Sequence, residues 1–209
     1  MFDGFVFSNG QYIEYQGKIL KNNIFSKDQI LLQQAIYSKY NGGSFYSGVN
    51  GQWICPDRKE LSIAHMVYYG LDPKRAHEHF LPFVLDEIEA TAATATFDDL
   101  EKMRLAEKEL PQEWEIHAYY DPNDLRMDVH LPGITKGSSC MMLVEHAGLK
   151  REDSYAFGDG INDLEMLTLV GHGVAMGNAD PRIKAIADIV SEDALEDGLA
   201  KAFVRLFDL

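Results

Sequence analysis

The last third of the chain alternates short apolar strands with helical patterns, and this alternation constrains the fold more than any other feature. The predicted strands cover residues 153–159, 172–179 and 188–192. The predicted helices cover residues 136–149, 161–171, 181–187 and 195–207. Strands that alternate with helices in this way form a parallel sheet wound on both faces. The sequence therefore predicts the α/β fold class, with a doubly wound, Rossmann-like core.

The middle of the chain has a different pattern, which is typical of an α+β module. Ser26 and Gln29 have the spacing of a capping box at the start of an amphipathic helix. Asn50-Gly51 lies between strand-like residues and indicates a hairpin. The other predicted elements are helices over 73–85 and 98–110 and strands over 87–97, 113–120 and 125–133. We expect the last two strands to pair antiparallel.

The first residues decide how these two patterns combine. "FVFSN" (5–9) is an apolar strand pattern that turns at Asn9-Gly10, and the turn alone is a sufficient reason for Asn9. If this strand joins the parallel sheet, the middle module is an insertion between two pieces of one core. We place the core pieces at residues 1–22 and 132–209 and the inserted module at residues 23–131.

Two carboxylates and a carboxamide lie close together after the first predicted strand of the C-terminal part. Asp159 stands at the carboxyl end of that strand, where parallel sheets bind ligands. Asn162 and Asp163 follow in the first turn of the next helix, where backbone N–H groups favour an anion. Mg²⁺ takes one or two carboxylates with water and phosphate oxygens. Lys136, at the start of the preceding helix, adds a positive charge. These residues suit a magnesium and phosphate site, and helix capping explains them as well.

Three segments carry a resemblance to a known family. "KGSS" (136–139), "AFGDGINDLEML" (156–167) and "GVAMGNADPRIKAIAD" (173–188) resemble the haloacid dehalogenase (HAD)-like phosphatases. Within them the chain looks like the Cof-type branch, whose members carry an inserted α/β cap. The resemblance implies that residues 23–131 form the cap.

The resemblance also implies a role for each candidate site residue. Lys136 would stabilise the nucleophile and the phosphate, and Asp159 would bind Mg²⁺ directly. Asn162 and Asp163 would contact phosphate and metal-bound water. The implied cofactor is Mg²⁺, and the implied ligand is a small phosphorylated metabolite such as a sugar phosphate.

One part of the family pattern is missing from these letters. The family uses an aspartate nucleophile in a D-x-D-G-T stretch at the end of the first core strand, and no D-x-D occurs in the 209 residues. We therefore expect the N-terminal part of the core to be absent and this chain alone to be inactive, because no aspartyl-phosphate can form. The absent strands would leave a sheet edge exposed, which favours self-association or pairing with a separate N-terminal piece.

Three functions remain open at this stage. The leading one is a Mg²⁺-dependent phosphatase represented without its nucleophile. The alternative is a non-catalytic remnant that binds a phosphorylated ligand or a protein partner. Phosphoryl transfer to another sugar would use the same residues as hydrolysis.

Composition excludes several classes of partner. The formal net charge of −14, with no basic run to offset it, argues against binding to nucleic acid or to a membrane surface. No apolar run approaches the roughly 20 residues that span a bilayer. Cys55 and Cys140 are isolated thiols, which suggests a reducing compartment. We therefore expect a cytoplasmic protein.

Other conspicuous side chains have structural explanations. His77 and His79 are two residues apart, so on a helix they face different ways and do not share a metal. Methionines 141, 142 and 166 are expected in the core. The same is expected of the aromatic residues of the middle module, namely Phe45, Tyr46, Trp53, Trp114, Tyr119 and Tyr120.

Overall fold

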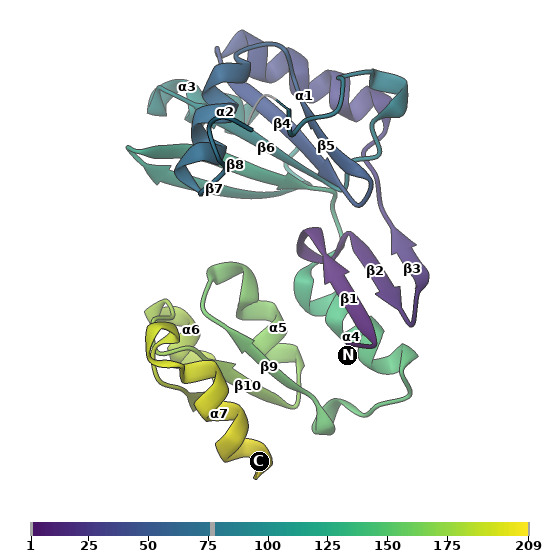
Figure 1. The fold of residues 1–209 in the computed structure, drawn as a ribbon, viewed down its shortest axis with the longest axis vertical. Helices are drawn as coiled ribbons and strands as arrows, with labels where there is room; N and C mark the ends of the chain where they lie inside the picture. Colours follow the sequence, from purple (N-terminus) through teal and green to yellow (C-terminus); the bar gives the residue numbers. More distant parts are fainter. Residues whose placement is uncertain (1, 76–77, 209) are drawn as a thin grey trace. The chain divides into compact units, whose positions relative to one another are not determined.

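A computed structural model of the chain describes residues 2–75 and 78–208. The chain divides into two compact units (Figure 1). Residues 1–21 with 134–209 make one unit, which we call the core unit, and residues 22–133 make the other, which we call the inserted unit.

The inserted unit is built on one antiparallel sheet with the strand order β5-β4-β6-β8-β7. Its strands are β4 (Gly43–Gly48), β5 (Gly51–Ile54), β6 (Ala92–Phe97), β7 (Glu115–Asp121) and β8 (Asp124–His130). The hairpin expected near Asn50 joins β4 to β5, and the predicted antiparallel pair is β7 with β8. Both expectations are confirmed.

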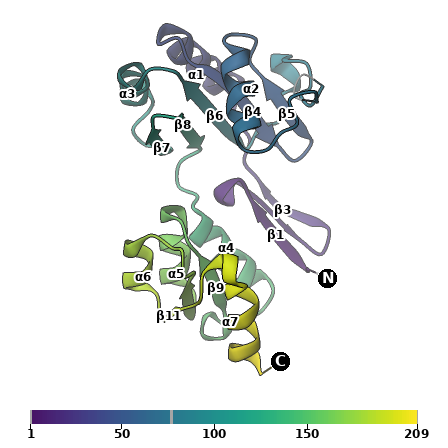
Figure 2. The same cartoon turned by 60° about the vertical axis from the view of Figure 1, so that its left-hand side comes forward.

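Helices cover both faces of this sheet (Figure 2). α1 (Lys27–Lys39) and α3 (Leu100–Glu109) share a large hydrophobic cluster with one face, where Tyr46 and Met127 are buried. α2 (Lys59–Tyr68) lies on the opposite face, where Ser62 hydrogen-bonds Thr96 at 3.0 Å. The capping box predicted at the start of α1 is present.

The helix predicted over residues 73–85 is wrong. Residues 73–75 and 78–84 contain no helix, and a short 3-10 helix follows at Leu85–Glu87. The helix of this region is α2, which lies upstream and is followed by Gly70 at a φ of +97°. Pro82 lacks an N–H and would clash with the preceding turn, so a helix through this window is unfavourable.

The core unit contains a parallel sheet with the strand order β11-β10-β9. Its strands are β9 (Tyr155–Gly158), β10 (His172–Ala175) and β11 (Ile189–Val190). The helices are α4 (Lys136–His146), α5 (Leu164–Leu169), α6 (Pro181–Ile186) and α7 (Gly198–Phe207). The parallel sheet with alternating helices confirms the predicted α/β class. Asp180 caps α6 and Pro181 is its first residue, as expected.

The first strand does not join the parallel sheet. β1 (Gly4–Phe7), β2 (Tyr12–Tyr15) and β3 (Lys18–Asn22) form a separate sheet, in which β1 pairs antiparallel with β2. The short 3-10 turn at Ser8–Gly10 reverses the chain through three successive residues with positive φ, so β1 folds back on its own neighbour. The turn is nevertheless tied to the second core piece, because Ser139 Oγ donates to the Gly10 carbonyl at 2.9 Å.

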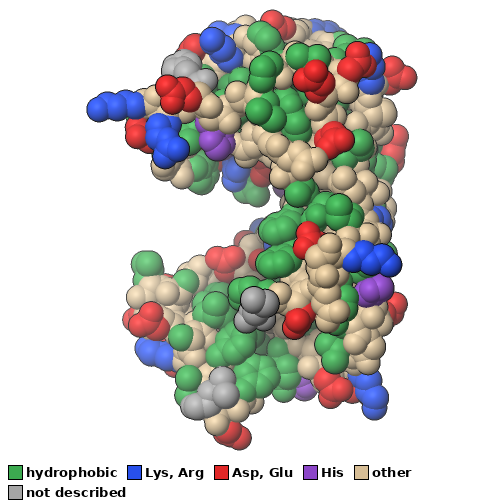
Figure 3. Space-filling model, turned by 45° about the vertical axis from the view of Figure 1, so that its right-hand side comes forward, with side chains coloured by type: hydrophobic (Ala, Val, Ile, Leu, Met, Phe, Trp, Pro, Cys, Tyr) green, Lys and Arg blue, Asp and Glu red, His purple; other side chains and the backbone are tan. Residues whose placement is uncertain are grey.

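Both outer strands of the parallel sheet, β9 and β11, have a neighbouring strand on one side only among the described residues. β9 pairs with β10 on one side only. α7 packs beside this strand, where Phe203 stacks on Phe157 at a centroid distance of 4.9 Å. Figure 3 shows hydrophobic side chains gathered on the surface of the core unit. Met142 is exposed, against expectation, whereas Met141 and Met166 pack against the core cluster.

Candidate functional site

The loop after β9 closes on itself around the carboxylate of Asp163. Asp163 Oδ2 accepts hydrogen bonds from the backbone N–H groups of Asp159 and Gly160, each at 3.1 Å. A Cβ atom on Gly158 would lie 2.5 Å from Asp163 Cβ, so this position requires glycine. Only 6% of Asp163 is exposed. The carboxylate therefore acts first as the internal anchor of the loop.

Lys136 neutralises this anchor from the start of α4. Its Nζ donates to Asp163 Oδ1 at 2.6 Å. Two features bring the lysine here. Thr135 begins α4 with a capping box. Gly137 lets α4 approach α5 closely, since a Cβ there would lie 2.8 Å from Met166 N. Both oxygens of Asp163 are thus engaged, one by a cation and one by backbone amides.

Asp159 differs from Asp163 in exposure and in partners. Its side chain is exposed, and Oδ2 accepts a hydrogen bond from Asn178 Nδ2 at 3.0 Å. Its backbone carbonyl accepts from Asp180 N at 3.0 Å. The carboxylate of Asp180 is stabilised by Arg182, whose hydrogen bonds lower the pKa of Asp180 to about 2. Asp159 therefore has a neutral side-chain donor, whereas Asp163 faces the ammonium group of Lys136.

The structure brings the residues predicted for the site together. Lys136, Asp159 and Asp163 line one cavity of about 600 Å³ in the core unit, with Phe157 and Met176 on its apolar side. Asn162 lies in the same loop, and its Nδ2 donates to Asn9 Oδ1 at 3.3 Å.

Sequence reasoning passed over two residues. The sequence explains Asn9 as a turn residue, and it assigns no role to Asn178, which lies in the segment 173–188 that resembles the family. Both meet the loop through contacts between distant segments, and the only sequence signal was the Asn-Gly pair and the "GNA" tripeptide.

The donor set fits a magnesium ion only in part. Mg²⁺ is held by one or two carboxylates together with water and phosphate oxygens. Asp159 Oδ1 receives no hydrogen bond within residues 2–75 and 78–208, so it is the oxygen that remains for a cation. Across the same residues no group of three or more His, Cys, Asp or Glu side chains is placed to hold a metal. Both oxygens of Asp163 are already engaged, so Asp159 is the predicted metal ligand that has an oxygen left for a cation.

Residues 2–203 match the model of the haloacid dehalogenase-like hydrolases. The chain belongs to this family. The match confirms the resemblance seen in the sequence, including that to the Cof-type branch. No helix in residues 2–75 or 78–208 has the length and apolar character needed to cross a membrane.

Three relatives show what this HAD-like chain is similar to. Putative phosphatase YkrA of Bacillus subtilis is 45% identical over 84 residues, which are 40% of this chain and 33% of YkrA. The 5-amino-6-(5-phospho-D-ribitylamino)uracil phosphatase YcsE of the same species is 28% identical over 184 residues, which are 88% of this chain and 64% of YcsE. The solved HAD subclass IIB sugar phosphatase BT4131 is 25% identical with a TM-score of 0.76, over 99% of this chain and 76% of that one. The chain spans less than two thirds of both Bacillus relatives.

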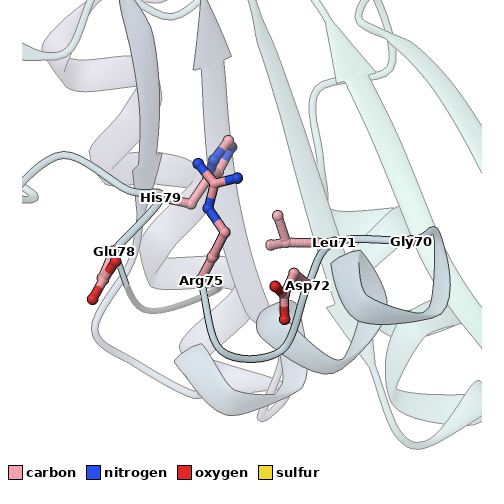
Figure 4. Close-up of a pocket in the computed structure, with 6 residues that line it drawn as sticks. All are labelled: Gly70, Leu71, Asp72, Arg75, Glu78 and His79. Atoms are coloured by element: carbon pink, nitrogen blue, oxygen red, sulfur yellow. The ribbon is translucent and has the colours of Figure 1, made fainter.

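The inserted unit of this HAD-like chain has a cavity of its own. A space of about 630 Å³ lies beside the loop after α2, and its lining among the described residues includes Gly70, Leu71, Asp72, Arg75, Glu78 and His79. In Figure 4 the side chain of Glu78 extends away from those of Arg75 and His79. His79 contacts Gln52 Oε1 at 2.5 Å, and His77 lies outside the described residues. The lining has both charge signs on a surface loop and identifies no ligand.

A hydrogen-bonded network around the buried carboxylate of Asp124 holds α2 to the sheet of the inserted unit. Asp124 accepts from His65 at 2.8 Å, from Tyr69 at 2.6 Å and from Arg126 at 3.0 Å. The bond to Asp124 raises the pKa of Tyr69 to about 12. Because every charge in this network has a partner, we interpret it as structural.

The aromatic residues of the inserted unit divide into two groups. Phe45, Tyr46, Trp53 and Trp114 are buried, which confirms the expectation that they form its core. Tyr119 and Tyr120 are exposed, so the same expectation is wrong for them. They stand on β7, the edge strand, where cations cover their rings instead of core side chains, Arg126 over Tyr119 and Arg104 over Tyr120.

Proposed function

We propose that this chain forms the magnesium and phosphate half of a phosphatase that acts on small phosphorylated metabolites such as sugar phosphates. The observation that carries the proposal is the arrangement of Lys136, Asp159 and Asp163 around one cavity at the end of β9. A phosphate monoester is close to dianionic, so its binding requires concentrated positive charge. The phosphatase names of YkrA, YcsE and BT4131 support the same class of ligand.

Each residue has a part in this proposal. Asp159 would hold Mg²⁺, which supplies positive charge opposite the phosphate oxygens. Lys136 and Asn162 would donate to those oxygens, the lysine with charge and the carboxamide without it. Asp163 keeps the loop and Lys136 in place, and in the proposal it contacts metal-bound water. A direct bond between Asp163 and the metal would replace one of its hydrogen bonds.

We propose that these 209 residues by themselves bind a phosphorylated ligand but do not hydrolyse it. They contain no D-x-D, so the attacking aspartate of the family reaction has to come from outside them. Binding without turnover is also what the alternative function, a non-catalytic phosphate binder, predicts. The two functions therefore separate only in the full open reading frame.

The test is a steady-state assay of the full open reading frame with sugar phosphates and a chromogenic phosphomonoester. We expect Mg²⁺-dependent hydrolysis that is lost in Asp159→Asn and retained in Asp153→Asn, which alters an exposed carboxylate on a different loop. Ligand binding without turnover would favour the non-catalytic alternative. Turnover that ignores Asp159→Asn would defeat the proposal.

We also propose that the core unit associates with a second copy of the chain through the open edge of its parallel sheet. β9 has a neighbour on one side only, and Phe203 and Phe207 of α7 lie partly exposed beside it. Unpaired strand edges flanked by apolar surface favour strand pairing between molecules. Sedimentation of the 209-residue chain should show a concentration-dependent dimer, weakened in Phe203→Ser. A monomer at every concentration would contradict this part of the proposal.

A further inference from the structure

Asn178 joins three loops at the carboxyl ends of the parallel strands. It lies between β10 and α6, and its Nδ2 donates to Asp159 in the loop after β9. Its Oδ1 accepts from Ala194 N at 3.1 Å in the loop after β11. One carboxamide thus touches the loops that follow all three strands of this sheet.

The chemistry of these contacts determines which way the carboxamide points. The backbone N–H of Ala194 can only donate, so the amide atom facing it is the oxygen. The NH₂ group must then face Asp159, where a carboxylate accepts. The contact with Ala194 therefore identifies the NH₂ group as the end of the Asn178 side chain that faces Asp159.

The preceding residue makes this position possible. Gly177 N donates to Glu192 O at 3.0 Å, and a Cβ atom on Gly177 would lie 2.4 Å from Asp193 N. Only glycine allows the two loops to pass this closely. Gly177 consequently allows the Asn178 side chain to reach Asp159, and a bulkier residue at position 177 would move Asn178 away.

The two aspartates of the loop are held by different kinds of donor. Asp163 is held by an ammonium group and two backbone amides, and both its oxygens are engaged. Asp159 is held by one neutral amide at Oδ2, which fixes the carboxylate without cancelling its charge. A neutral donor on one oxygen leaves the other oxygen oriented and negative, which is what a hard cation requires.

We propose that Asn178 is a positioning residue that holds the Asp159 carboxylate in the orientation that binds a divalent cation. This inference rests on the proposed function, and it assigns to Asn178 a role in metal affinity and none in the chemical step. Groups that orient metal ligands typically contribute about 10–100-fold to metal affinity.

The test uses Mn²⁺ as the probe, with free Mn²⁺ measured by electron paramagnetic resonance in titrations of the full-length protein. Asn178→Leu keeps the approximate size and removes both hydrogen bonds. We expect its Mn²⁺ dissociation constant to rise about tenfold. In the phosphatase assay the Mg²⁺ concentration for half-maximal rate should rise, while the rate at saturating Mg²⁺ stays unchanged.

Ala194→Pro separates positioning from simple attachment of the loops. Ala194 is the first residue of a 3-10 helix, and Asp193 before it has a φ of −59° and a ψ of 148°, a backbone that accepts a following proline. This variant removes the N–H to Asn178 and leaves the carboxamide beside Asp159. We expect a much smaller loss of affinity than in Asn178→Leu. Equal losses in both variants would show that attachment of the loops is what matters, and would overturn the inference.

Two further variants complete the test. Asn50→Leu removes another hydrogen bond from a carboxamide to a carboxylate, the one from Asn50 Nδ2 to Glu89 Oε2 at 2.6 Å in the inserted unit. This variant should leave Mn²⁺ binding unchanged. Asp159→Asn should abolish binding. If Asp159→Asn abolishes Mn²⁺ binding but Asn178→Leu leaves the dissociation constant unchanged, this inference alone is overturned. A wild-type protein without Mn²⁺ binding, or binding that ignores Asp159→Asn, overturns the proposed metal site and this inference with it.

Discussion

The two units bury their hydrophobic residues in different ways. Among the described residues, the main cluster of the inserted unit contains 17 buried side chains, with both tryptophans, around one five-stranded sheet. The corresponding cluster of the core unit contains seven, three of them alanines and none aromatic, beside a three-stranded sheet. Burial of a large apolar side chain contributes about 1.5–3 kcal/mol. The inserted unit therefore has the larger intrinsic stability, and the core unit carries the residues proposed for chemistry.

The largest effect is expected from Met127→Ala. Met127 is fully buried in β8, and such a truncation costs about 2–5 kcal/mol because it leaves a cavity. Both tryptophans of the chain lie in the inserted unit, so tryptophan fluorescence in urea reports on that unit. Met127→Ala should lower the fluorescence midpoint, and Ile183→Ala in the core unit should not. If both variants shift it equally, the units unfold together and the comparison fails.

A pH dependence of the inserted unit is expected next. Burial, with a smaller contribution from His117, lowers the pKa of His130 from 6.5 to about 4. Between these values the unfolded chain binds a proton that the folded unit does not, so stability is complete above pH 6.5 and falls as the pH drops towards 4. The total loss is roughly 3 kcal/mol.

The measurement is the urea midpoint of tryptophan fluorescence between pH 7 and pH 4. In His130→Leu the slope with pH should be reduced, whatever the absolute stability of that variant. An unchanged slope would assign the pH dependence to other groups.

Lys136→Met should weaken the core unit by about 2 kcal/mol. It removes the cation that faces the buried Asp163 carboxylate, and the cost is below the 3–5 kcal/mol of a fully buried pair because 28% of the lysine side chain is exposed. Hydrogen exchange of residues 155–175 should accelerate. Lys201→Met, on the exposed surface of α7, is the matched control and should leave exchange unchanged. Equal protection from hydrogen exchange in both variants would show that Lys136 does not stabilise the loop.

The smallest effect concerns the turn after β1. Asn9 has a φ of 50° and a ψ of 34°, a left-handed conformation that favours glycine. Asn9→Ala should therefore be about 1 kcal/mol less stable than Asn9→Gly. The stability difference is measured by thermal unfolding of the two variants, with hydrogen exchange of the core unit as the readout. Equal stabilities would mean that the turn relaxes without strain.

Elements with a local signal were predicted well. The capping box at Ser26, the Asp180-Pro181 start of α6 and the β7–β8 pair depend on residues a few positions apart, and all three are present. The helix predicted over 73–85 is wrong, because Pro82 lacks an N–H and is unfavourable inside a helix. The sequence indicated the turn at Asn9-Gly10 but did not decide whether β1 would join the parallel sheet or pair with the next strand, β2, because a strand of four residues can pair with either.

The candidate site was predicted only as a set of residue types. The spacing of Asp159, Asn162 and Asp163 within one loop was evident, and Lys136 added a positive charge at the start of the preceding helix. The family resemblance assigned a role to each of these residues. Asn178 and Asn9 were missed because their contacts join segments 19 and 153 positions apart in the chain. Such contacts depend on how the strands align, which no short pattern encodes.

The amino-acid sequence by itself determined the α/β alternation, the family and the loop that gathers two aspartates and an asparagine, because these follow from short-range periodicity and local spacing. Only the tertiary structure decided that Lys136 pairs with Asp163, that Asp159 receives a neutral donor from Asn178 and that β1 turns away from the parallel sheet. The physical reason is that charge pairing and strand pairing act through space. Their outcome depends on which groups packing brings within about 3 Å of one another.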